Sequence, residues 1–150
     1  MFKRIIVLIV ITLNVPLFAN NEIDRKQLLL MHKQGMDAHK NIGLEKWLSG
    51  FTDDYISANR GEISYPTSDE MKSRLMPYIT STKFEYYRDM IPPVVRVFQD
   101  GTLGWVIVQI EAKGQTGDDV IQFQFAWIEL YAKKNGKWVS VGNVSNRKSN

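Results

Sequence analysis

Residues 103–145 read LGWVIVQIEAKGQTGDDVIQFQFAWIELYAKKNGKWVSVGNVS, and this stretch decides the fold. Strand-forming residues dominate three segments, Leu103–Lys113, Val120–Ala132 and Lys137–Ser145. Asn135-Gly136 is a strong hairpin signal, because both central positions of a type I′ turn need positive φ. Gly114–Asp119 supplies the other turn. The stretch therefore predicts consecutive hairpins, which produce an antiparallel, meandering sheet.

Two further strands are predicted immediately upstream, at Lys83–Asp89 and Val94–Gln99. Asp100-Gly101 separates the second of them from Leu103, and we expect the same type of hairpin turn there, with positive φ at both residues. The whole second half of the chain thus has strand periodicity.

The first half has helical periodicity instead. A first helix is predicted over Asp24–Lys40, and a second is expected to follow Gly43. The first carries a stripe of apolar and small residues at spacings of three and four, namely Leu28, Met31, Gly35, Ala38 and Ile42. The second places on one face Leu44, Trp47, Leu48, Phe51 and Tyr55. Because glycine and alanine are small, a neighbour can approach the first stripe closely.

A third helix is predicted after a short extended piece, Ile56–Tyr65, that is broken by a turn at Asn59-Arg60-Gly61. Thr67-Ser68-Asp69-Glu70 has the pattern of a capping box. Its buried face is expected to contain Met71, Leu75, Tyr78 and Ile79, and Pro77 is expected to kink or end the helix. Helices first and strands afterwards predict an α+β domain whose helices pack on one face of the sheet.

The N-terminus has the three parts of a secretory signal peptide in order. Lys3 and Arg4 precede the apolar run Ile5–Leu13, and Ala19 offers a small residue at a cleavage point before Asn20. The apolar run is shorter than the ~20 residues that span a bilayer. We therefore predict a signal peptide over residues 1–19, a single domain over residues 20–150, and an exported, periplasmic or secreted protein without a membrane contact after cleavage.

Charge and composition narrow the range of partners. Loss of Lys3 and Arg4 would lower the net charge from +3 to +1, and no basic stripe remains, which argues against nucleic acid. The chain has no cysteine, so disulfides, thiol nucleophiles and thiolate metal sites are excluded. No phosphate-binding glycine loop is present, and we predict no cofactor. A hydrophobic content of 44% argues for a packed core rather than disorder.

The order of elements, ending in an Asn-Gly-Lys-Trp hairpin, resembles the cystatin-like cone of the nuclear transport factor 2-like superfamily, and more narrowly its small exported SnoaL-like members. The segments that carry the likeness are Asp37–His39, Gly61–Ile63, Pro93–Val97, Asp100–Val106, Phe125–Ile128, Gly136–Trp138 and Asn143–Asn146. The resemblance implies N-terminal helices packed on a curved antiparallel sheet. It does not select a chemistry, because that superfamily contains isomerases, dehydratases, ligand carriers and dimerisation modules.

The only two histidines, His32 and His39, lie seven positions apart with Met36 between them. His39 is a candidate base in a ligand pocket. The alternatives are a structural or solvated histidine and a weak copper or zinc site formed by all three. Two histidines without a carboxylate at ligand spacing are a poor zinc signature, and we predict no metal.

Ketosteroid-isomerase-like members of the superfamily combine a carboxylate base with an oxyanion-stabilising tyrosine or protonated acid inside an apolar cone. The resemblance therefore makes candidates of Asp53, Asp54, Glu111 and Glu129, with Tyr55, Tyr65 or Tyr131 as partners. Alternation places Glu129 on the same face as Phe123, Phe125, Trp127 and Tyr131. Either face of that strand can be the outer one, so the sequence does not decide whether Glu129 lies inside.

The mid-strand tryptophans and nearby aromatic and polar residues give the pocket candidates His39, Tyr55, Tyr65, Arg96, Trp105, Trp127, Glu129 and Asn143. The predicted function is binding of a small apolar or aromatic ligand in a cone-shaped pocket, without a catalytic centre. Two alternatives stay open: a SnoaL-like isomerase or dehydratase that uses His39 or a buried carboxylate as base, and self-association or protein interaction, including a homodimer through the sheet.

Overall fold

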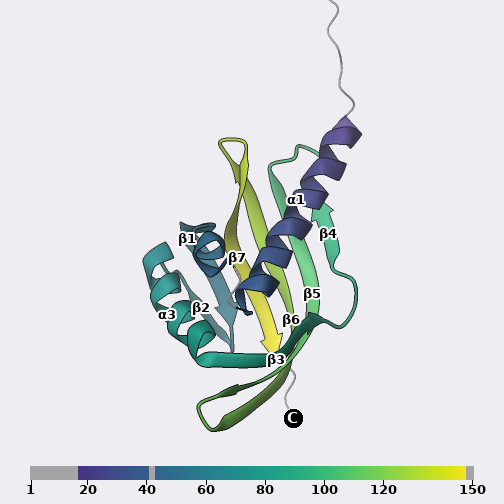
Figure 1. Cartoon of the computed structure of the whole chain (residues 1–150). Coiled ribbons are helices and arrows are strands. Elements are labelled where there is room, and N and C mark those ends of the chain that lie inside the picture. The colour runs from purple at the N-terminus through teal and green to yellow at the C-terminus, as the bar shows by residue number, and fades with distance from the viewer. Residues whose placement is uncertain (1–16, 41–42, 148–150) are drawn as a thin grey trace, which may run out of the picture.

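A computed structural model describes residues 17–40 and 43–147 (Figure 1). The three helices are α1 (Leu17–Ala38), α2 (Leu44–Leu48) and α3 (Ser68–Ser81). The strands are β1 (Phe51–Asn59), β2 (Glu62–Ser64), β3 (Thr82–Asp89), β4 (Val94–Val97), β5 (Leu103–Thr116), β6 (Asp119–Lys134) and β7 (Lys137–Arg147).

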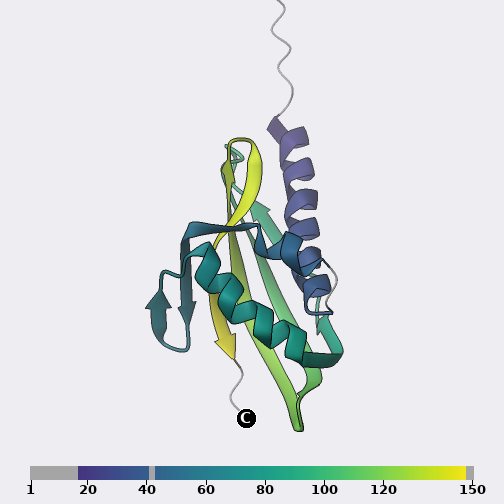
Figure 2. The ribbon, with the colours of Figure 1, turned by 60° about the vertical axis from the view of Figure 1, so that its left-hand side comes forward.

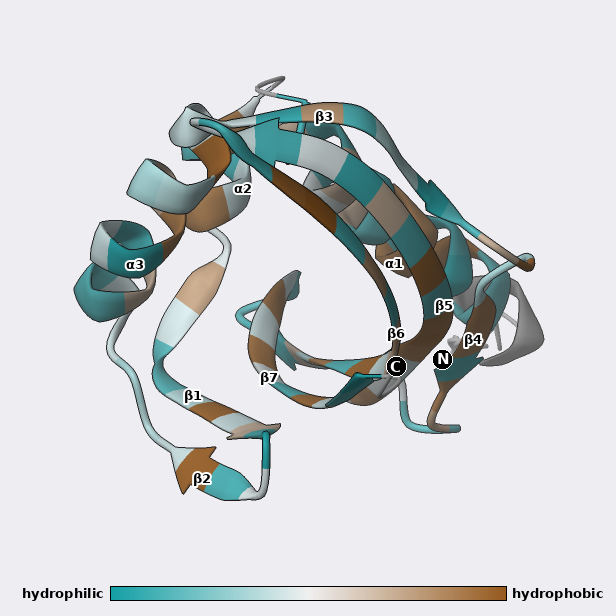
Figure 3. Cartoon of the chain, turned by 90° about the horizontal axis from the view of Figure 1, so that it is seen from below, coloured by the Kyte–Doolittle hydropathy of each residue, from teal (hydrophilic) through white to brown (hydrophobic). Residues whose placement is uncertain are grey.

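All the strands form one sheet in the order β2-β1-β7-β6-β5-β3, and β4 pairs with the same edge of β5 as β3 does. Seen end-on in Figure 3, the sheet curls from β2 and β1 through β7 and β6 to β5. The predicted α+β class, with N-terminal helices packed on a curved sheet, is confirmed. One pair, β1 with β7, is parallel, which makes the sheet mixed rather than wholly antiparallel.

The β5–β6 hairpin is longer than predicted. Gly114 lies inside β5, paired with Ile121, and the turn consists only of Gly117 and Asp118. A Cβ on Gly114 would stand 2.7 Å from the carbonyl oxygen of Lys83 in β3. Gly114 therefore serves the close approach of a neighbouring strand, and its reading as a turn residue was wrong.

The two Asx-Gly turns differ. At Asn135-Gly136 both residues have positive φ, 50° and 76°, as a type I′ turn requires. At Asp100-Gly101 only Gly101 has positive φ, 68°. Its N–H donates to the carbonyl of Phe98 over 2.9 Å. The β4–β5 hairpin is present, but its loop is longer than the predicted two-residue turn.

The predicted second helix is wrong beyond Leu48. Helix α2 has five residues, and the chain then enters β1 at Phe51. Phe51 and Tyr55 are four apart, a spacing that fits one face of a helix and also one face of a strand. The ring centroids of Phe51 and Tyr55 lie 5.2 Å apart along β1. The expected contact between the two rings is therefore present, but the backbone that carries them is a strand and not a helix.

Helix α1 ends at Ala38, two residues before its predicted end, and its buried side is rotated from the predicted stripe. The buried side chains are Asp24, Leu28, His32, Met36 and Ala38. Gly35 admits a close neighbour as expected, since a Cβ there would lie 3.0 Å from Nε1 of Trp47. Ile42, assigned to the same stripe, lies outside the described residues.

Helix α3 begins with the predicted capping box: the Thr67 hydroxyl accepts from the Glu70 N–H, and the Glu70 carboxylate accepts from the Thr67 N–H. Pro77 does not end the helix, which continues to Ser81. The carbonyl that Pro77 leaves without a helical donor belongs to Ser73, which is exposed, so water can satisfy it.

Helices α1 and α3 lie on the same side of the sheet (Figures 1 and 2), which we call the inner face. The core there joins Leu28 and Met36 of α1 to inward residues of β4, β5, β6 and β7. A second cluster joins α2 to α3 through Leu44, Leu48 and Ile79. In the described part of the chain no helix covers the opposite, outer face (Figure 2).

The predicted signal peptide lies mostly outside the described residues, which begin at Leu17. Among the helices that the structure describes, none has the length and apolarity needed to cross a membrane.

Candidate functional site

A row of paired residues crosses the inner face and fixes the position of Glu129. Successive strands pair Ser57 with Asn143, Asn143 with Glu129, and Glu129 with Val106. Because paired residues share a face, the buried Val106 shows that Glu129 points inward. This decides the question that alternation alone left open.

The carboxylate of Glu129 accepts three hydrogen bonds. Its Oε1 lies 3.0 Å from the Trp127 indole nitrogen, which donates, and 3.0 Å from Nδ1 of His32. Its Oε2 accepts from the Tyr131 hydroxyl over 2.9 Å. The side chain of Glu129 nevertheless remains 18% exposed. It is therefore a preorganised acceptor that solvent, or a ligand, still reaches.

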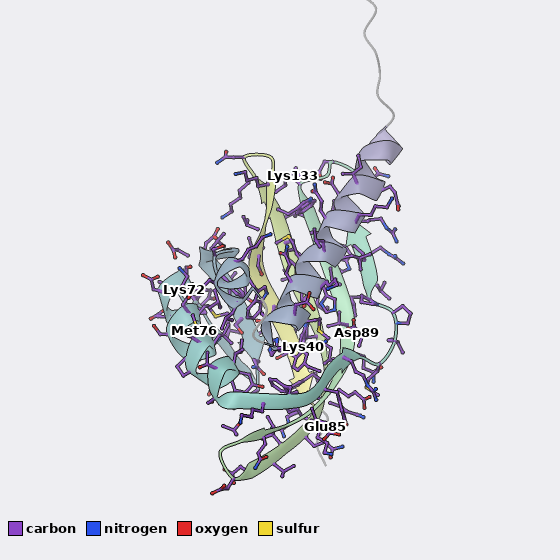
Figure 4. The ribbon with its side chains drawn as sticks, in the orientation of Figure 1. Lys40, Lys72, Met76, Glu85, Asp89 and Lys133 are labelled. Carbon is purple, nitrogen blue, oxygen red and sulfur yellow. The ribbon has the colours of Figure 1, made fainter. Side chains whose placement is uncertain are left out.

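His32 comes to this site from the middle of α1 and lies between two carboxylates. Its Nδ1 faces Glu129, and its Nε2 lies 3.1 Å from Oδ1 of Asp89, which is the last residue of β3 (Figure 4). The imidazole is 4% exposed, whereas the Asp89 side chain is 27% exposed. A doubly protonated imidazolium donates to both carboxylates in this geometry.

The protonation of His32 follows from its two neighbours. Burial lowers its pKa, but the hydrogen bonds to Glu129 and Asp89 and their negative charges outweigh burial, so the pKa is raised above its usual value. We refer to Glu129, His32 and Asp89 as the carboxylate–histidine cluster. With the imidazole charged, the cluster carries one net negative charge.

His39, the predicted pocket base, has a different environment. It is buried, its Nδ1 lies 2.7 Å from the Gly35 carbonyl oxygen, and its ring stacks on Tyr87 at 4.0 Å. Burial lowers its pKa to about 4, which keeps the imidazole neutral at neutral pH. His39 is a weak base packed among rings, and the carboxylate–histidine cluster is better suited to hold a proton.

Three inward tyrosines stay protonated beside the cluster. Burial raises the pKa of Tyr55, Tyr87 and Tyr131 above the usual range, and the negative charge of Glu129 adds to the effect in each case. These hydroxyls can therefore act only as neutral donors and acceptors. The same three rings, with the half-buried Trp127, make the surroundings of Glu129 aromatic.

Five of the eight predicted pocket residues lie on the inner face. They are His39, Tyr55, Trp127, Glu129 and Asn143. Arg96 and Trp105 pair with each other on the outer face, because the buried residues next to them, Val95 and Val106, take the inward positions. Tyr65 follows β2 and is 71% exposed, so it too lies away from this site.

The other three predicted carboxylates have partners outside the carboxylate–histidine cluster. Asp53 accepts from the backbone N–H of Ser68 over 3.0 Å, and Asp54 pairs with Lys134. Glu111 forms an ion pair with Arg88 on the outer face. These contacts give each of the three a structural partner on the surface.

Sequence reasoning missed Asp89 and did not assign His32 a partner. His32 does continue a series at four-residue spacing, Asp24, Leu28, His32 and Met36, all of which are buried. That series could have identified the inward side of α1. Asp89 carries no such signal, since it is an acidic residue at the end of a strand.

A second polar contact holds the other half of α1 on the sheet. Buried Asp24 accepts from Lys133 over 2.5 Å and from the Trp138 indole over 2.9 Å. Figure 4 shows Lys133 at the end of the sheet far from Glu85. Together with His32, this contact fixes the register of α1 on the inner face.

No group of three potential ligand side chains that could hold a metal ion occurs within residues 17–40 and 43–147. His32 and His39, the predicted histidine pair, do not converge: His32 contacts carboxylates and His39 contacts aromatic rings.

Comparison with known proteins identifies the fold. No family model matches the sequence, and no curated protein matches it. Among solved structures, a nuclear transport factor 2-like protein from Cytophaga hutchinsonii superposes with a TM-score of 0.64 at 17% identity, over 83% of this chain and 98% of that one. A ketosteroid isomerase-like protein from Erwinia carotovora gives 0.65 at 14% identity, over 85% and 98%.

A protein proposed to be a scytalone dehydratase, from Novosphingobium aromaticivorans, gives a TM-score of 0.68 at 13% identity, over 88% of this chain and 89% of that one. The chain therefore has the nuclear transport factor 2-like fold, as the resemblance in the sequence predicted. At these identities the likeness establishes the fold and not the chemistry.

Proposed function

We propose that the protein binds a small apolar or aromatic molecule on the inner face of its sheet. The observation that supports the proposal is the state of Glu129. Its carboxylate points inward, accepts three hydrogen bonds and is still partly exposed. Half-buried Phe123, Phe125 and Trp127 stand beside it on β6 and supply an apolar wall. Binding sites for small molecules combine such walls with a few fixed polar groups.

Binding is tested with the neutral aromatic dye N-phenyl-1-naphthylamine, by its fluorescence gain and by tryptophan quenching. Trp127→Ala should weaken binding about 10-fold or more, because the indole forms part of the wall and fixes Glu129. Trp105→Ala is the matched control, since Trp105 lies on the outer face of the adjacent strand. Equal loss in both variants, or no dye binding by the wild type, would contradict the proposal.

A second candidate function is proton transfer on a carbonyl compound, as in an isomerase or dehydratase. It is favoured by the hydrogen-bonded series Tyr131–Glu129–His32–Asp89, in which two carboxylates share an imidazole. Glu129 would accept a proton from the carbon next to the carbonyl and return it to another position. His32 would adjust the basicity of Glu129 without touching the substrate.

The assay follows isomerisation of a β,γ-unsaturated ketone to its conjugated form by NMR in D₂O. Glu129→Gln should lower the rate about 100-fold or more, as expected for loss of a general base. Glu111→Gln, on the outer face, should leave it unchanged. A rate indistinguishable from buffer for the wild type would exclude this candidate and leave the binding proposal intact.

Export is proposed from the N-terminal residues Lys3, Arg4, Ile5–Leu13 and Ala19. Expression of the full chain in a bacterium, with fractionation and intact mass, tests it. A periplasmic product that begins at Asn20 is expected, and a cytoplasmic product that retains Met1 would contradict it.

A further inference from the structure

The Glu129 carboxylate can accept one more hydrogen bond than the described residues donate to it. Each carboxylate oxygen has two lone pairs. Oε1 uses both, one toward the indole N–H of Trp127 and one toward Nδ1 of His32. Among the described residues, Oε2 accepts only from the Tyr131 hydroxyl. Because the side chain is 18% exposed, a ligand that carries an N–H or O–H group can donate to Oε2, whereas a carbonyl oxygen placed there would meet a second acceptor.

The charge of the carboxylate–histidine cluster favours a positively charged donor over a neutral one. Glu129 and Asp89 are negative and the imidazolium of His32 between them is positive, so one negative charge remains. A neutral ligand that covered Glu129 would remove water from this charge without replacing it, which opposes binding. An ammonium group would replace the water with an opposite charge and a charge-assisted hydrogen bond.

The negative charge of Glu129 also acts on the rings around it. Burial, and after it the charge of Glu129, raises the pKa of Tyr55 and of Tyr131. The positive charge of Arg74, an exposed residue of α3, opposes Glu129 at Tyr55, but its effect there is the smaller of the two. The surroundings of Glu129 are therefore a region of negative potential, which attracts cations.

The aromatic residues of β6 fit the carbon skeleton of such a cation. The rings of Phe123, Phe125 and Trp127 follow one another on the inner face, with centroids 4.7 Å and then 5.9 Å apart. Glu129 is the next inward residue of the same strand. A cation is attracted to the face of an aromatic ring as well as to a carboxylate, and tryptophan attracts it most strongly. Rings and carboxylate thus favour the same kind of ligand.

We propose that the ligand of the inner face is an organic ammonium ion with an apolar or aromatic skeleton. Its N–H group donates to Oε2 of Glu129, and its skeleton lies against Phe125 and Trp127. This ligand class rests on the binding function proposed above and narrows it, because the apolar wall by itself would accept a neutral molecule equally well.

The test compares two ligands of nearly the same shape, 1-naphthylmethylamine and 1-naphthylmethanol. At pH 7 the amine is an ammonium ion and the alcohol is neutral, and both can donate a hydrogen bond. Isothermal titration calorimetry, on protein purified after expression of the full chain, should give a dissociation constant about 10-fold or more lower for the amine, because hydrogen bonds between charged groups are the stronger ones. Added sodium chloride should weaken binding of the amine and leave binding of the alcohol unchanged.

Glu129→Gln keeps the shape of the side chain and removes its charge. This variant should bind the amine about 10-fold or more weakly than the wild type does, and the alcohol within about 3-fold. Glu111→Gln is the matched control. It removes the same charge from the outer face of the adjacent strand, where Glu111 pairs with Arg88, and should bind both ligands as the wild type does. Circular dichroism verifies that both variants are folded.

Equal affinity of the wild type for the two ligands would overturn this ligand class and leave the binding proposal intact. Failure of the amine to bind would overturn it too, and the neutral dye N-phenyl-1-naphthylamine would then decide whether the binding proposal fails with it. A preference for the amine that Glu129→Gln retains would place the ammonium group elsewhere and overturn the assignment to Glu129. The comparison of the two ligands uses the wild type, so it decides the preference for charge even if Glu129→Gln is unfolded.

Discussion

The two faces of β6 contain similar side chains in opposite circumstances. On the inner face, Glu129 lies among aromatic rings and has its hydrogen bonds satisfied by Trp127, Tyr131 and His32. On the outer face, Ile128 lies between Ile107 and Val144 of the neighbouring strands, and no helix of the described chain covers these side chains. The inner face therefore holds a polar group whose hydrogen-bond partners are in place. The outer face holds apolar side chains that no helix of the described chain covers.

The two kinds of side chain contribute to stability in different ways. A buried polar group destabilises the folded state little while all its hydrogen-bond partners are present. Removal of one partner lowers the free energy of unfolding by several kcal/mol. An exposed apolar group costs little in the monomer and contributes only when a second surface arrives. The inner face thus combines fixed polar groups with an apolar surround, whereas the outer face offers apolar side chains to solvent.

The largest difference between the faces should appear in β5. Ile110 is 0% exposed on the inner face, and Ile107 is 40% exposed on the outer face. Ile110→Ala should lower the free energy of unfolding by about 4 kcal/mol, and Ile107→Ala by less than about 1 kcal/mol. Urea denaturation of both variants at the same protein concentration measures the two losses. Equal losses at both positions would show that the faces are wrongly assigned.

A second prediction concerns acid. The unfolded His39 binds a proton near its usual pKa of 6.5, whereas the folded one does so only at about 4. The folded pKa is lowered, so this stability is complete above pH 6.5 and is lost as pH falls toward 4. The loss is about 3 kcal/mol, from about 1.4 kcal/mol per pKa unit.

His39→Phe keeps a ring against Tyr87 and removes the titrating group. The variant should lose about 3 kcal/mol less than the wild type between pH 7 and pH 4, as measured by urea denaturation. His32 differs in sign: its pKa is raised on folding, so its contribution is complete below 6.5 and declines as pH rises through the folded pKa. Identical acid sensitivity of wild type and His39→Phe would refute the assignment.

The smallest predicted effect compares the two mid-strand tryptophans. Trp127→Phe removes a hydrogen bond to the charged Glu129 and should cost about 2 kcal/mol of unfolding free energy. Trp105→Phe, on the outer face, should cost less than about 1 kcal/mol. Matching values for the two variants would mean that the indole of Trp127 does not support Glu129.

Several features of the fold could be predicted because they depend on nearby residues. Thr67 and Glu70 define a capping box by their spacing alone, and Asn135-Gly136 defines a turn by its tolerance of positive φ. Strand β1 could not be predicted in the same way. Phe51 and Tyr55 fit both periodicities, and the choice depends on the parallel pairing with β7, more than eighty positions away.

The site was predictable only in part. Glu129 and Trp127 stood out as residues, but His32 and Glu129 are 97 positions apart, and no local pattern links them. Asp89 joins them only because β3 ends beside the middle of α1. Such contacts depend on how distant elements pack together, and neither the composition nor the spacing of residues predicts which two of them will meet.

By itself, the sequence determined the alternation of β6, and hence that Phe123, Phe125, Trp127, Glu129 and Tyr131 share a face. Only the tertiary structure decided that this face is the inner one. Both sets of alternating residues in β6 are rich in apolar side chains, so hydrophobicity does not distinguish them. The choice is made where α1 packs, because the polar groups that Glu129 needs, foremost His32, come from that helix.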